Sequence, residues 1–392
     1  MKNSLILAIF LIILNPSFSQ NIEWTFTTGG EIHSSPIIVD GKIYIGSGDS
    51  KIYAIDKNTG KEVWSYESDG AIYSDVGFQE DLIFFSNDKG NLYSLDRHSG
   101  ELLWKFSSGG EKKIDLWDYY LSSPVASNGL VYWGSGDGHV YALNSKNGEL
   151  VWKFNTGSIV HASPVIAYGK VLIGNYSGDF YALDQHTGSE IWKFKAVGSR
   201  YFPNAEFQKA ALVNDGVVYI GSRDLNLYAL DLKTGRGIWN MQEKGGSWII
   251  ATPLIYGDNI YFGTSDTYKF YSLNKNNGRE NWSIPIHTRS YGSPVVHNKM
   301  IIFPGFDGKL RGVDPDSGEE KWLFQSATSR EKYDAVYDKQ NNFRKDVGIH
   351  NYTPQSESLL LSLGAFINTP LLLEDTIYIG SMDGKLYAIN IF

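Results

Sequence analysis

Residues 54–64 read AIDKNTGKEVW, and residues 94–104 read SLDRHSGELLW. The same eleven-residue phrase returns at 142–152, 182–192, 229–239, 272–282 and 312–322. Every copy has Asp or Asn four residues before a Gly, and Trp four residues after it. Chance does not produce seven identical spacings, so the chain is an array of repeated units.

Each phrase ends a longer unit, which the residues 34–66 illustrate. Four short apolar or alternating runs, SPIIV, KIYIG, KIYAI and EVWSY, are separated by the turn sequences DG, GSGDS and DKNTG. Runs of this length between turn residues predict four antiparallel strands. In the last turn, Asp56 can bond its own backbone and Gly60 can adopt a positive φ.

The repeat length predicts a β-propeller. A four-stranded unit that returns every 40 to 48 residues is typical of a propeller blade. Eight innermost strands are expected, because eight positions can each begin one. They are Pro36, Val76, Pro124, Pro164, Ala211, Pro253, Pro294 and Pro370. The fold class is therefore all-β, with eight four-stranded blades.

The two ends of the chain complement each other. Residues 369–392 supply three strands of a last blade and then stop, whereas residues 21–26 resemble a fourth strand with no blade before it. We expect the N-terminal strand to complete the last blade, leaving no open sheet edge. Eight Trp residues then serve as structural docking residues between blades: Trp24, Trp64, Trp104, Trp152, Trp192, Trp239, Trp282 and Trp322.

Composition excludes several classes of function. The 392 residues are 42% apolar, and 35 basic against 43 acidic residues give a net charge of -8. Phosphate backbones are repelled overall, so no nucleic-acid partner is expected. The chain has no Cys, which excludes disulfides, thiolate metal sites and cysteine nucleophiles.

The N-terminus predicts a signal peptide over residues 1–19. Lys2 precedes an apolar run at 5–14, and Ser17 and Ser19 offer small residues before a cleavage site. The run is too short to span a membrane, and no Cys is present to be acylated. We therefore expect an exported, periplasmic or secreted monomer without a transmembrane segment or lipid anchor, whose residues 20–392 form one propeller domain.

The repeated phrase resembles the tryptophan-docking motif of the pyrroloquinoline quinone (PQQ) repeat family, over almost the whole mature chain. That resemblance implies one of two functions. Quinoprotein dehydrogenases of the family hold PQQ with calcium, and many place adjacent cysteines against the quinone, which this chain cannot do. The family's outer-membrane protein assembly factor B branch uses the propeller as a protein-binding scaffold, although its members are lipoproteins.

Departures from the repeat period indicate where function is located. Insertions at 107–121, 195–209, 240–250 and about 326–364 all fall between the outer strand of one blade and the inner strand of the next. Such connections share one face of a propeller, so the elaboration is one-sided. The longest insertion is polar and is expected to be a surface excursion, in part helical.

Aromatic and basic residues gather in or beside these loops and predict a binding face. The candidates are His33, Tyr73, Trp117, Tyr119, His161, Arg200, Tyr201, Trp248, Arg289 and Tyr291. The alternative is that these side chains pack the loops against one another. No catalytic or metal-ligating constellation is found. We expect a non-catalytic scaffold for another envelope protein, with no cofactor. The alternatives are a PQQ- and calcium-dependent dehydrogenase of alcohols or sugars, and a propeller that binds a small molecule or carbohydrate.

Overall fold

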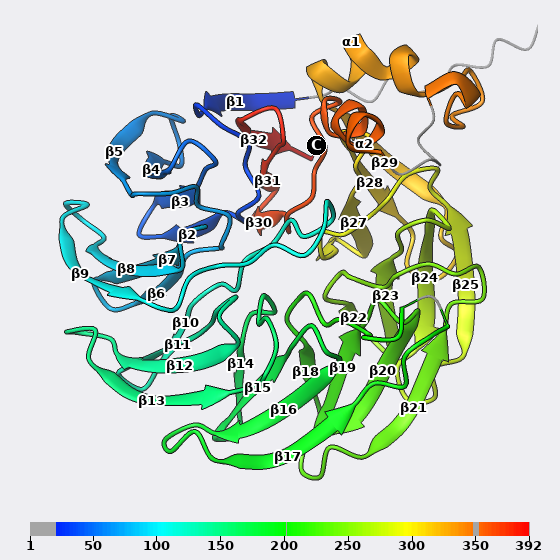
Figure 1. The fold of residues 1–392 in the computed structure, drawn as a ribbon. Coiled ribbons are helices and arrows are strands. Elements are labelled where there is room, and N and C mark those ends of the chain that lie inside the picture. The colour runs from blue at the N-terminus through cyan, green and yellow to red at the C-terminus, as the bar shows by residue number, and fades with distance from the viewer. Residues whose placement is uncertain (1–20, 201, 348–352, 392) are drawn as a thin grey trace, which may run out of the picture.

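The computed structural model describes residues 21–200, 202–347 and 353–391. In this part of the chain, thirty-two strands form eight four-stranded antiparallel sheets arranged in a ring (Figure 1). The prediction of an eight-bladed propeller is confirmed. The predicted signal peptide lies outside the described residues.

Each blade contributes one short strand to the inside of the ring and three longer ones outward (Figure 1). The innermost strands are β2 (Ile37–Val39), β6 (Gly77–Gln79), β10 (Val125–Ser127), β14 (Val165–Ala167), β18 (Leu212–Asn214), β22 (Leu254–Tyr256), β26 (Val295–His297) and β30 (Leu371–Leu373). The second strands are β3 (Lys42–Gly46), β7 (Leu82–Ser86), β11 (Leu130–Gly134), β15 (Lys170–Gly174), β19 (Val217–Gly221), β23 (Asn259–Gly263), β27 (Met300–Pro304) and β31 (Thr376–Gly380).

The two outer positions complete each sheet. The third strands are β4 (Lys51–Asp56), β8 (Asn91–Asp96), β12 (His139–Asn144), β16 (Asp179–Asp184), β20 (Asn226–Asp231), β24 (Lys269–Asn274), β28 (Lys309–Val313) and β32 (Lys385–Asn390). The outermost are β5 (Glu62–Glu67), β9 (Leu102–Ser107), β13 (Leu150–Asn155), β17 (Glu190–Lys195), β21 (Gly237–Gln242), β25 (Glu280–Pro285), β29 (Glu320–Gln325) and β1 (Asn21–Thr27). The second and third strands carry most of the core, because adjacent blades cover both of their faces.

The repeated phrase forms the joint between neighbouring blades. The indole of Trp64 lies against Gly100 of the next blade so closely that a Cβ on Gly100 would come within 2.7 Å of it. The same indole donates a hydrogen bond to the carbonyl of Arg97, at 3.2 Å. Six more indoles repeat this bond to the next blade: Trp24, Trp104, Trp152, Trp192, Trp239 and Trp282. Burying one indole contributes at most about 4–6 kcal/mol.

The ring closes as the two chain ends predict. Strand β1 pairs antiparallel with β32, and the resulting sheet has the order β1-β32-β31-β30. Trp24 lies opposite Ala388 in this pairing and docks on Gly60 of the first blade. The N-terminal strand thus joins the last blade to the first.

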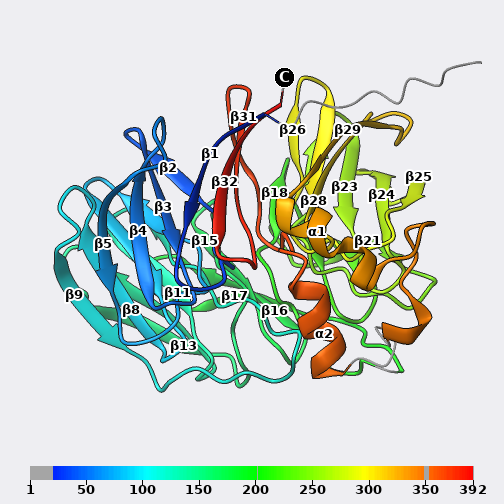
Figure 2. The same ribbon diagram turned by 90° about the horizontal axis from the view of Figure 1, so that it is seen from above.

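The insertion between β29 and β30 contains two helices and a short 3-10 turn. Helix α1 (Ala327–Val336) and helix α2 (Pro354–Leu361) flank the turn η1 (Lys345–Val347). Figure 2 shows α2 at one face of the ring. Within the insertion, Val336, Tyr337 and Leu360 are fully buried. The described part of the insertion is therefore more than the surface excursion we expected, because its apolar residues complete a core with other loops.

Candidate functional site

The connections from outer to inner strands meet over the centre of one face. We call residues 107–121, 195–209, 240–250 and 326–364, where described, the roof. In Figure 1 the segment between β9 and β10 runs across the ring toward β27 before it returns. Its Tyr120 donates a hydrogen bond to the carbonyl of Ile367, on the far side of the channel, at 2.7 Å. The roof therefore bridges blades that are distant along the ring.

Glu357 on α2 is the polar centre of the roof. Its carboxylate accepts hydrogen bonds from the Trp117 indole, at 3.2 Å, and from the Tyr119 hydroxyl. Arg289 donates to both of its oxygens from Nη1, at 2.9 and 2.8 Å. Arg289 is 1% exposed and Glu357 6%, so the ion pair is almost fully removed from water. The Arg289 Nε also lies 3.4 Å from Asp266.

Helix α2 is placed by its own N-terminus. Thr353 and Ser356 form a reciprocal capping box, and Pro354 occupies the first turn. A capping box satisfies two N–H groups that the first turn leaves free, and Pro at this point has no N–H to satisfy. The defined start of the helix fixes the position of Glu357 one turn later.

Aromatic side chains fill the space around Glu357. Tyr119 packs on Phe306 with ring centres 5.8 Å apart, and Tyr291 packs on Phe306 at 4.7 Å. Trp248 meets Trp117 edge to face at 5.7 Å, while the Arg223 guanidinium lies 3.8 Å from the centre of the Trp248 ring. These contacts merge the insertions into one apolar cluster.

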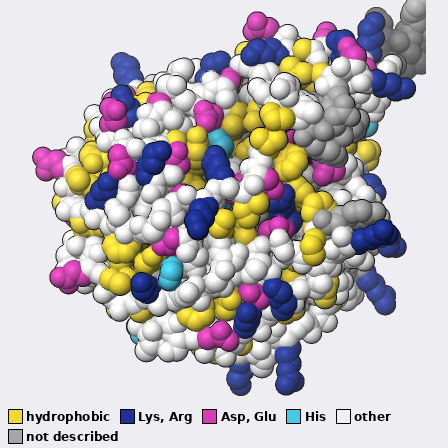
Figure 3. Space-filling model, in the orientation of Figure 1, with side chains coloured by type: hydrophobic (Ala, Val, Ile, Leu, Met, Phe, Trp, Pro, Cys, Tyr) yellow, Lys and Arg dark blue, Asp and Glu magenta, His cyan; other side chains and the backbone are white. Residues whose placement is uncertain are grey.

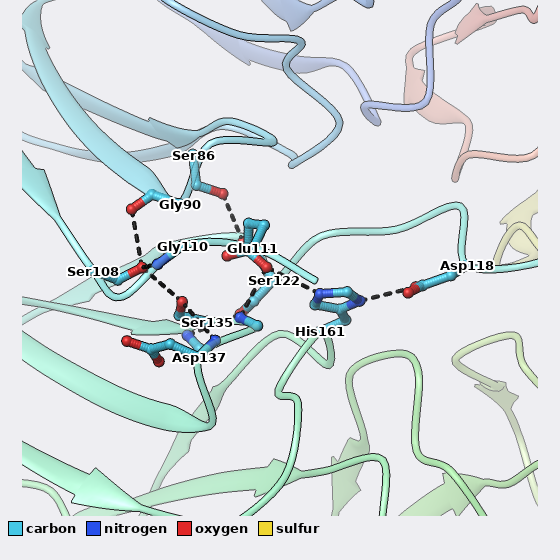
Figure 4. Close-up of polar contacts among 12 residues, drawn as sticks. Ser86, Gly90, Ser108, Gly110, Glu111, Asp118, Ser122, Ser135, Asp137 and His161 are labelled. Atoms are coloured by element: carbon cyan, nitrogen blue, oxygen red, sulfur yellow. Dashed lines mark hydrogen bonds and ion pairs between the residues drawn. The ribbon is translucent and has the colours of Figure 1, made fainter. Parts of the chain in front are cut away.

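His161 anchors the other end of the 107–121 loop (Figure 4). Its Nδ1 lies 2.8 Å from Asp118 and its Nε2 lies 3.0 Å from Glu111. Glu111 also accepts the N–H of Gly136 at 2.8 Å, and Asp118 accepts the hydroxyl of Tyr176 at 2.6 Å. The imidazole thus connects two residues of one loop to the innermost end of the fourth blade.

The protonation of this group follows from its partners. Burial lowers the pKa of His161, but the bonds to Asp118 and Glu111 outweigh burial and raise it to about 9. Burial also raises the pKa of Glu111. Near neutral pH His161 is therefore an imidazolium between two acidic groups, with both ring nitrogens donating.

The predicted site residues divide by exposure. Those that are buried are His33, Tyr119, His161, Trp248, Arg289 and Tyr291. Tyr73 and Trp117 are partly buried, Arg200 is exposed, and Tyr201 lies outside the described residues. The structure brings Trp117, Tyr119 and Trp248 of the roof together with Arg289 and Tyr291 beneath it, and these side chains pack the loops against one another. That these residues bind a partner stays a prediction.

His33 and Tyr73 lie beside the roof rather than in its core. The His33 ring lies 4.2 Å from that of Tyr73, and its Nδ1 lies 2.7 Å from the carbonyl of Tyr119. Burial lowers the pKa of His33 to about 4, so this imidazole is neutral. The Tyr73 hydroxyl donates to Glu31 at 3.0 Å.

The sequence reasoning missed the apolar residues that the roof exposes. Ile114 is 50% exposed, Leu116 45% and Val197 75%, and all three lie on insertions. Lys112, Lys113 and Arg200 are exposed nearby in the same loops. Figure 3 shows hydrophobic side chains toward the centre of this face, with acidic and basic groups interspersed. The sequence did contain a signal for these residues, because they are apolar residues within polar loops. The sequence analysis selected the aromatic and basic residues of those loops instead.

The described residues offer few ligands for a metal ion that would accompany a cofactor. Among the described residues, no group of three or more His, Asp or Glu side chains is placed to hold a metal ion. A cavity of about 440 Å³ lies on the ring axis, and Asp75 is the one carboxylate among its described lining residues. Calcium prefers six to eight oxygen ligands, often several carboxylates. These residues do not fit a PQQ–calcium pair.

Comparisons with known proteins agree on the fold. A family model described as outer membrane protein assembly factor BamB matches residues 17–73, 48–200 and 177–343. The structure is similar to that of BamB from Moraxella catarrhalis, with a TM-score of 0.71 and 17% identity, over 95% of this chain and 99% of that one. It is also similar to quinohemoprotein alcohol dehydrogenase from Comamonas testosteroni, with a TM-score of 0.68 and 12% identity, over 95% and 77% of the two chains.

A curated enzyme matches a short segment. Quinoprotein ethanol dehydrogenase of Pseudomonas aeruginosa is 35% identical over 86 residues, which are 18% of this chain and 14% of the enzyme. The chain therefore matches only a small part of that relative's length. Among the described residues, no helix has the length and apolar character needed to cross a membrane.

Proposed function

The chain belongs to the family described as outer membrane protein assembly factor BamB, and from that premise we propose that it is an exported scaffold of the cell envelope. In this proposal it binds another envelope protein through the roof and catalyses no reaction. It acts as a monomer that is neither lipid-anchored nor membrane-spanning. The family's description supports a role in outer-membrane protein assembly.

The observation that carries the proposal is a firmly held roof that exposes apolar side chains. Buried ion pairs at Glu357 and His161 hold the loops from within. Ile114, Leu116 and Val197 remain exposed outside. Apolar side chains held on a rigid support bind a partner with little loss of conformational entropy.

The surface chemistry suggests the kind of partner. Exposed basic residues lie close in sequence to the apolar residues on the same two loops: Lys112, Lys113 and Arg200. A partner surface with an apolar centre and an acidic rim is complementary to this arrangement.

Site-specific photocrosslinking tests the proposal. A photoreactive amino acid replaces Val197 on the roof or, as a matched control, Tyr168 in the turn between β14 and β15. Both side chains are 75% exposed. In intact cells we expect a discrete crosslinked protein from position 197 and none from position 168. Equal crosslinking at both positions, or none at position 197, would overturn the roof as the binding face.

Location in the envelope has its own test. We expect cell fractionation to recover a chain whose N-terminus lies near Gln20, in a soluble envelope or secreted fraction. Recovery of the full-length chain from the cytoplasm would contradict export.

The enzyme alternative is tested by adding PQQ and calcium to the purified protein. Saturable quinone absorbance with dye-linked oxidation of an alcohol or sugar would replace the scaffold proposal. We expect neither, because the donor set around the axis does not fit the pair.

A further inference from the structure

A band of polar groups surrounds the channel just inside the roof. Seven of the eight blades place a polar residue there, two positions before the innermost strand, and the fifth blade has Ala210 instead. The seven are Ser35, Asp75, Ser123, Ser163, Thr252, Ser293 and Thr369. Backbone N–H groups join neighbours around this band, for example Asp75 to the Ser123 hydroxyl and Ser123 to the Ser163 hydroxyl, both at 2.9 Å. Thr369 accepts in the same way from Ser293, at 3.3 Å.

Each of these bonds occupies one lone pair of a hydroxyl and does not involve its proton. A hydroxyl has one donor besides its lone pairs. Within the described residues, no acceptor is found for the hydroxyl protons of Ser123, Ser163 and Thr369. All three line the axial cavity of about 440 Å³. The cavity wall therefore offers several unused donors.

Lys209 adds a positive charge to the same cavity. Its ammonium nitrogen lies 4.0 Å from the centre of the Tyr120 ring. No carboxylate oxygen in the described part of the chain lies within 4.0 Å of that nitrogen. Burial lowers the pKa of Lys209 to about 8, although the charge of Asp75 acts in the opposite direction. The ammonium of Lys209 makes no direct ion pair within the described residues, so an anionic group that binds beside it would add a charge-assisted hydrogen bond.

Two acceptors also line the cavity. Asp75 accepts the N–H of Ser35 with one oxygen, at 2.5 Å. The Oε1 of Gln208 is buried and has no partner, while its Nε2 donates to Tyr176 at 3.3 Å. Acceptors and an ammonium without a direct ion pair to the described residues, in one cavity, favour a ligand with both signs of charge.

The cavity is closed by the roof and reached from the other direction. Tyr120 lies on the roof side. Phe78, which also lines the cavity, is 50% exposed and belongs to β6, which runs away from the roof. A solute can therefore enter from the end of the channel that faces away from the roof.

We propose that the axial cavity binds a small zwitterion of the amino-acid type. Its carboxylate is held by Lys209 and the hydroxyls of Ser123 and Ser163, and its amine lies toward Asp75 and Gln208. The site goes beyond the scaffold function, because it assigns a small-molecule ligand to the interior of the ring.

Saturation-transfer NMR and calorimetry on the purified protein test the proposal. The probes are ω-amino acids from glycine to ε-aminocaproate, with butyrate and butylamine as partial ligands. We expect one amino-acid length to bind more tightly than either partial ligand. Lys209→Met should lower the affinity for that amino acid by about ten-fold or more, since a charge-assisted hydrogen bond is lost. Asp75→Asn should lower the affinity for the amino acid toward the affinity for butyrate. It should leave butyrate binding unchanged or make it stronger.

Control variants separate binding from folding. Lys146→Met removes an exposed lysine from a turn outside the cavity and should change nothing. The thermal transition of Lys209→Met should stay cooperative and close to that of the native protein, because the ammonium makes no direct ion pair with a carboxylate in the described part of the chain. The proposal is overturned if no probe binds up to its solubility limit, or if Lys209→Met binds as Lys146→Met does.

Discussion

Single residues in this protein take their chemistry from the loops rather than from the repeat. His33 and His161 occupy equivalent positions before the innermost strands of two blades. Burial without a close carboxylate on both sides leaves His33 neutral, whereas Asp118 and Glu111 hold His161 charged. The two positions are equivalent in the repeat, and the 107–121 loop explains why only His161 is an imidazolium.

Stability is expected to fall at alkaline pH because of His161. Its pKa rises from 6.5 to about 9 on folding, so the folded state binds the proton more tightly. The stabilisation, about 3 kcal/mol at most, is complete below pH 6.5 and is lost as pH rises through about 9. Urea unfolding at several pH values measures this slope. His161→Gln should flatten it, and an unchanged slope would contradict the assignment.

A second prediction concerns the buried ion pair of Glu357. Glu357→Ala leaves the buried Arg289 without its two-oxygen partner and is expected to destabilise the protein by about 3–5 kcal/mol. Denaturant unfolding measures the loss, and hydrogen exchange should show faster exchange in residues 112–121. The matched control is Glu319→Ala, which breaks an exposed ion pair with Lys321 and should cost about 0–1 kcal/mol. Equal effects of the two variants would show that Glu357 is not central.

The joint between two blades depends on a glycine, Gly100, for two reasons: its backbone conformation and its lack of a Cβ. Gly100 has a φ of +76°, and its missing Cβ leaves room for the indole of Trp64. Gly129 has a φ of +78°, and a Cβ added there would meet no atom within 4 Å. The two glycines therefore separate the cost of backbone conformation from the cost of lost docking.

We expect Gly100→Ala to be clearly worse than Gly129→Ala. Both variants carry a penalty of about 1–2 kcal/mol for a left-handed backbone with a Cβ. Gly100→Ala must also displace the indole, which adds roughly 1–3 kcal/mol of overpacking. Thermal and urea unfolding of the two proteins measure the difference. Similar stabilities would mean that the glycine is retained for its φ alone.

The blades could be predicted because their sequence repeats. The roof could not be predicted because its loops do not repeat. Strand, turn and docking positions recur within each unit, so local patterns located them, and Trp24 indicated the closure. Trp117 and Glu357, by contrast, are separated by 240 residues, and no spacing in the sequence connects them. Aromatic residues in the loops predicted a binding face, yet most of them are buried in the roof. The exposed Leu116 and Val197 carry no pattern that distinguishes them from core residues.

The whole molecule depends on one non-local pairing. Strand β1, which is seven residues long, pairs with β32 at the opposite end of the chain, and Trp24 then docks on the first blade. Without this pairing, β32 would be the outer edge of a three-stranded last blade. Contacts between consecutive blades are local, but closure brings together the two most distant segments of the described chain.

A variant without residues 1–28 is therefore expected to lose closure while keeping most of its blades. Strand β32 becomes an exposed edge, so we expect a lower melting temperature and self-association through that edge, measured by calorimetry and analytical ultracentrifugation. A synthetic peptide of residues 21–27 should restore the monomer by adding the missing strand. The same peptide with Trp24→Ala should restore less, because it pairs with β32 but cannot dock on Gly60. If the truncated chain is monomeric and as stable as the native protein, the ring does not need this strand, and the joint at Trp24 is dispensable.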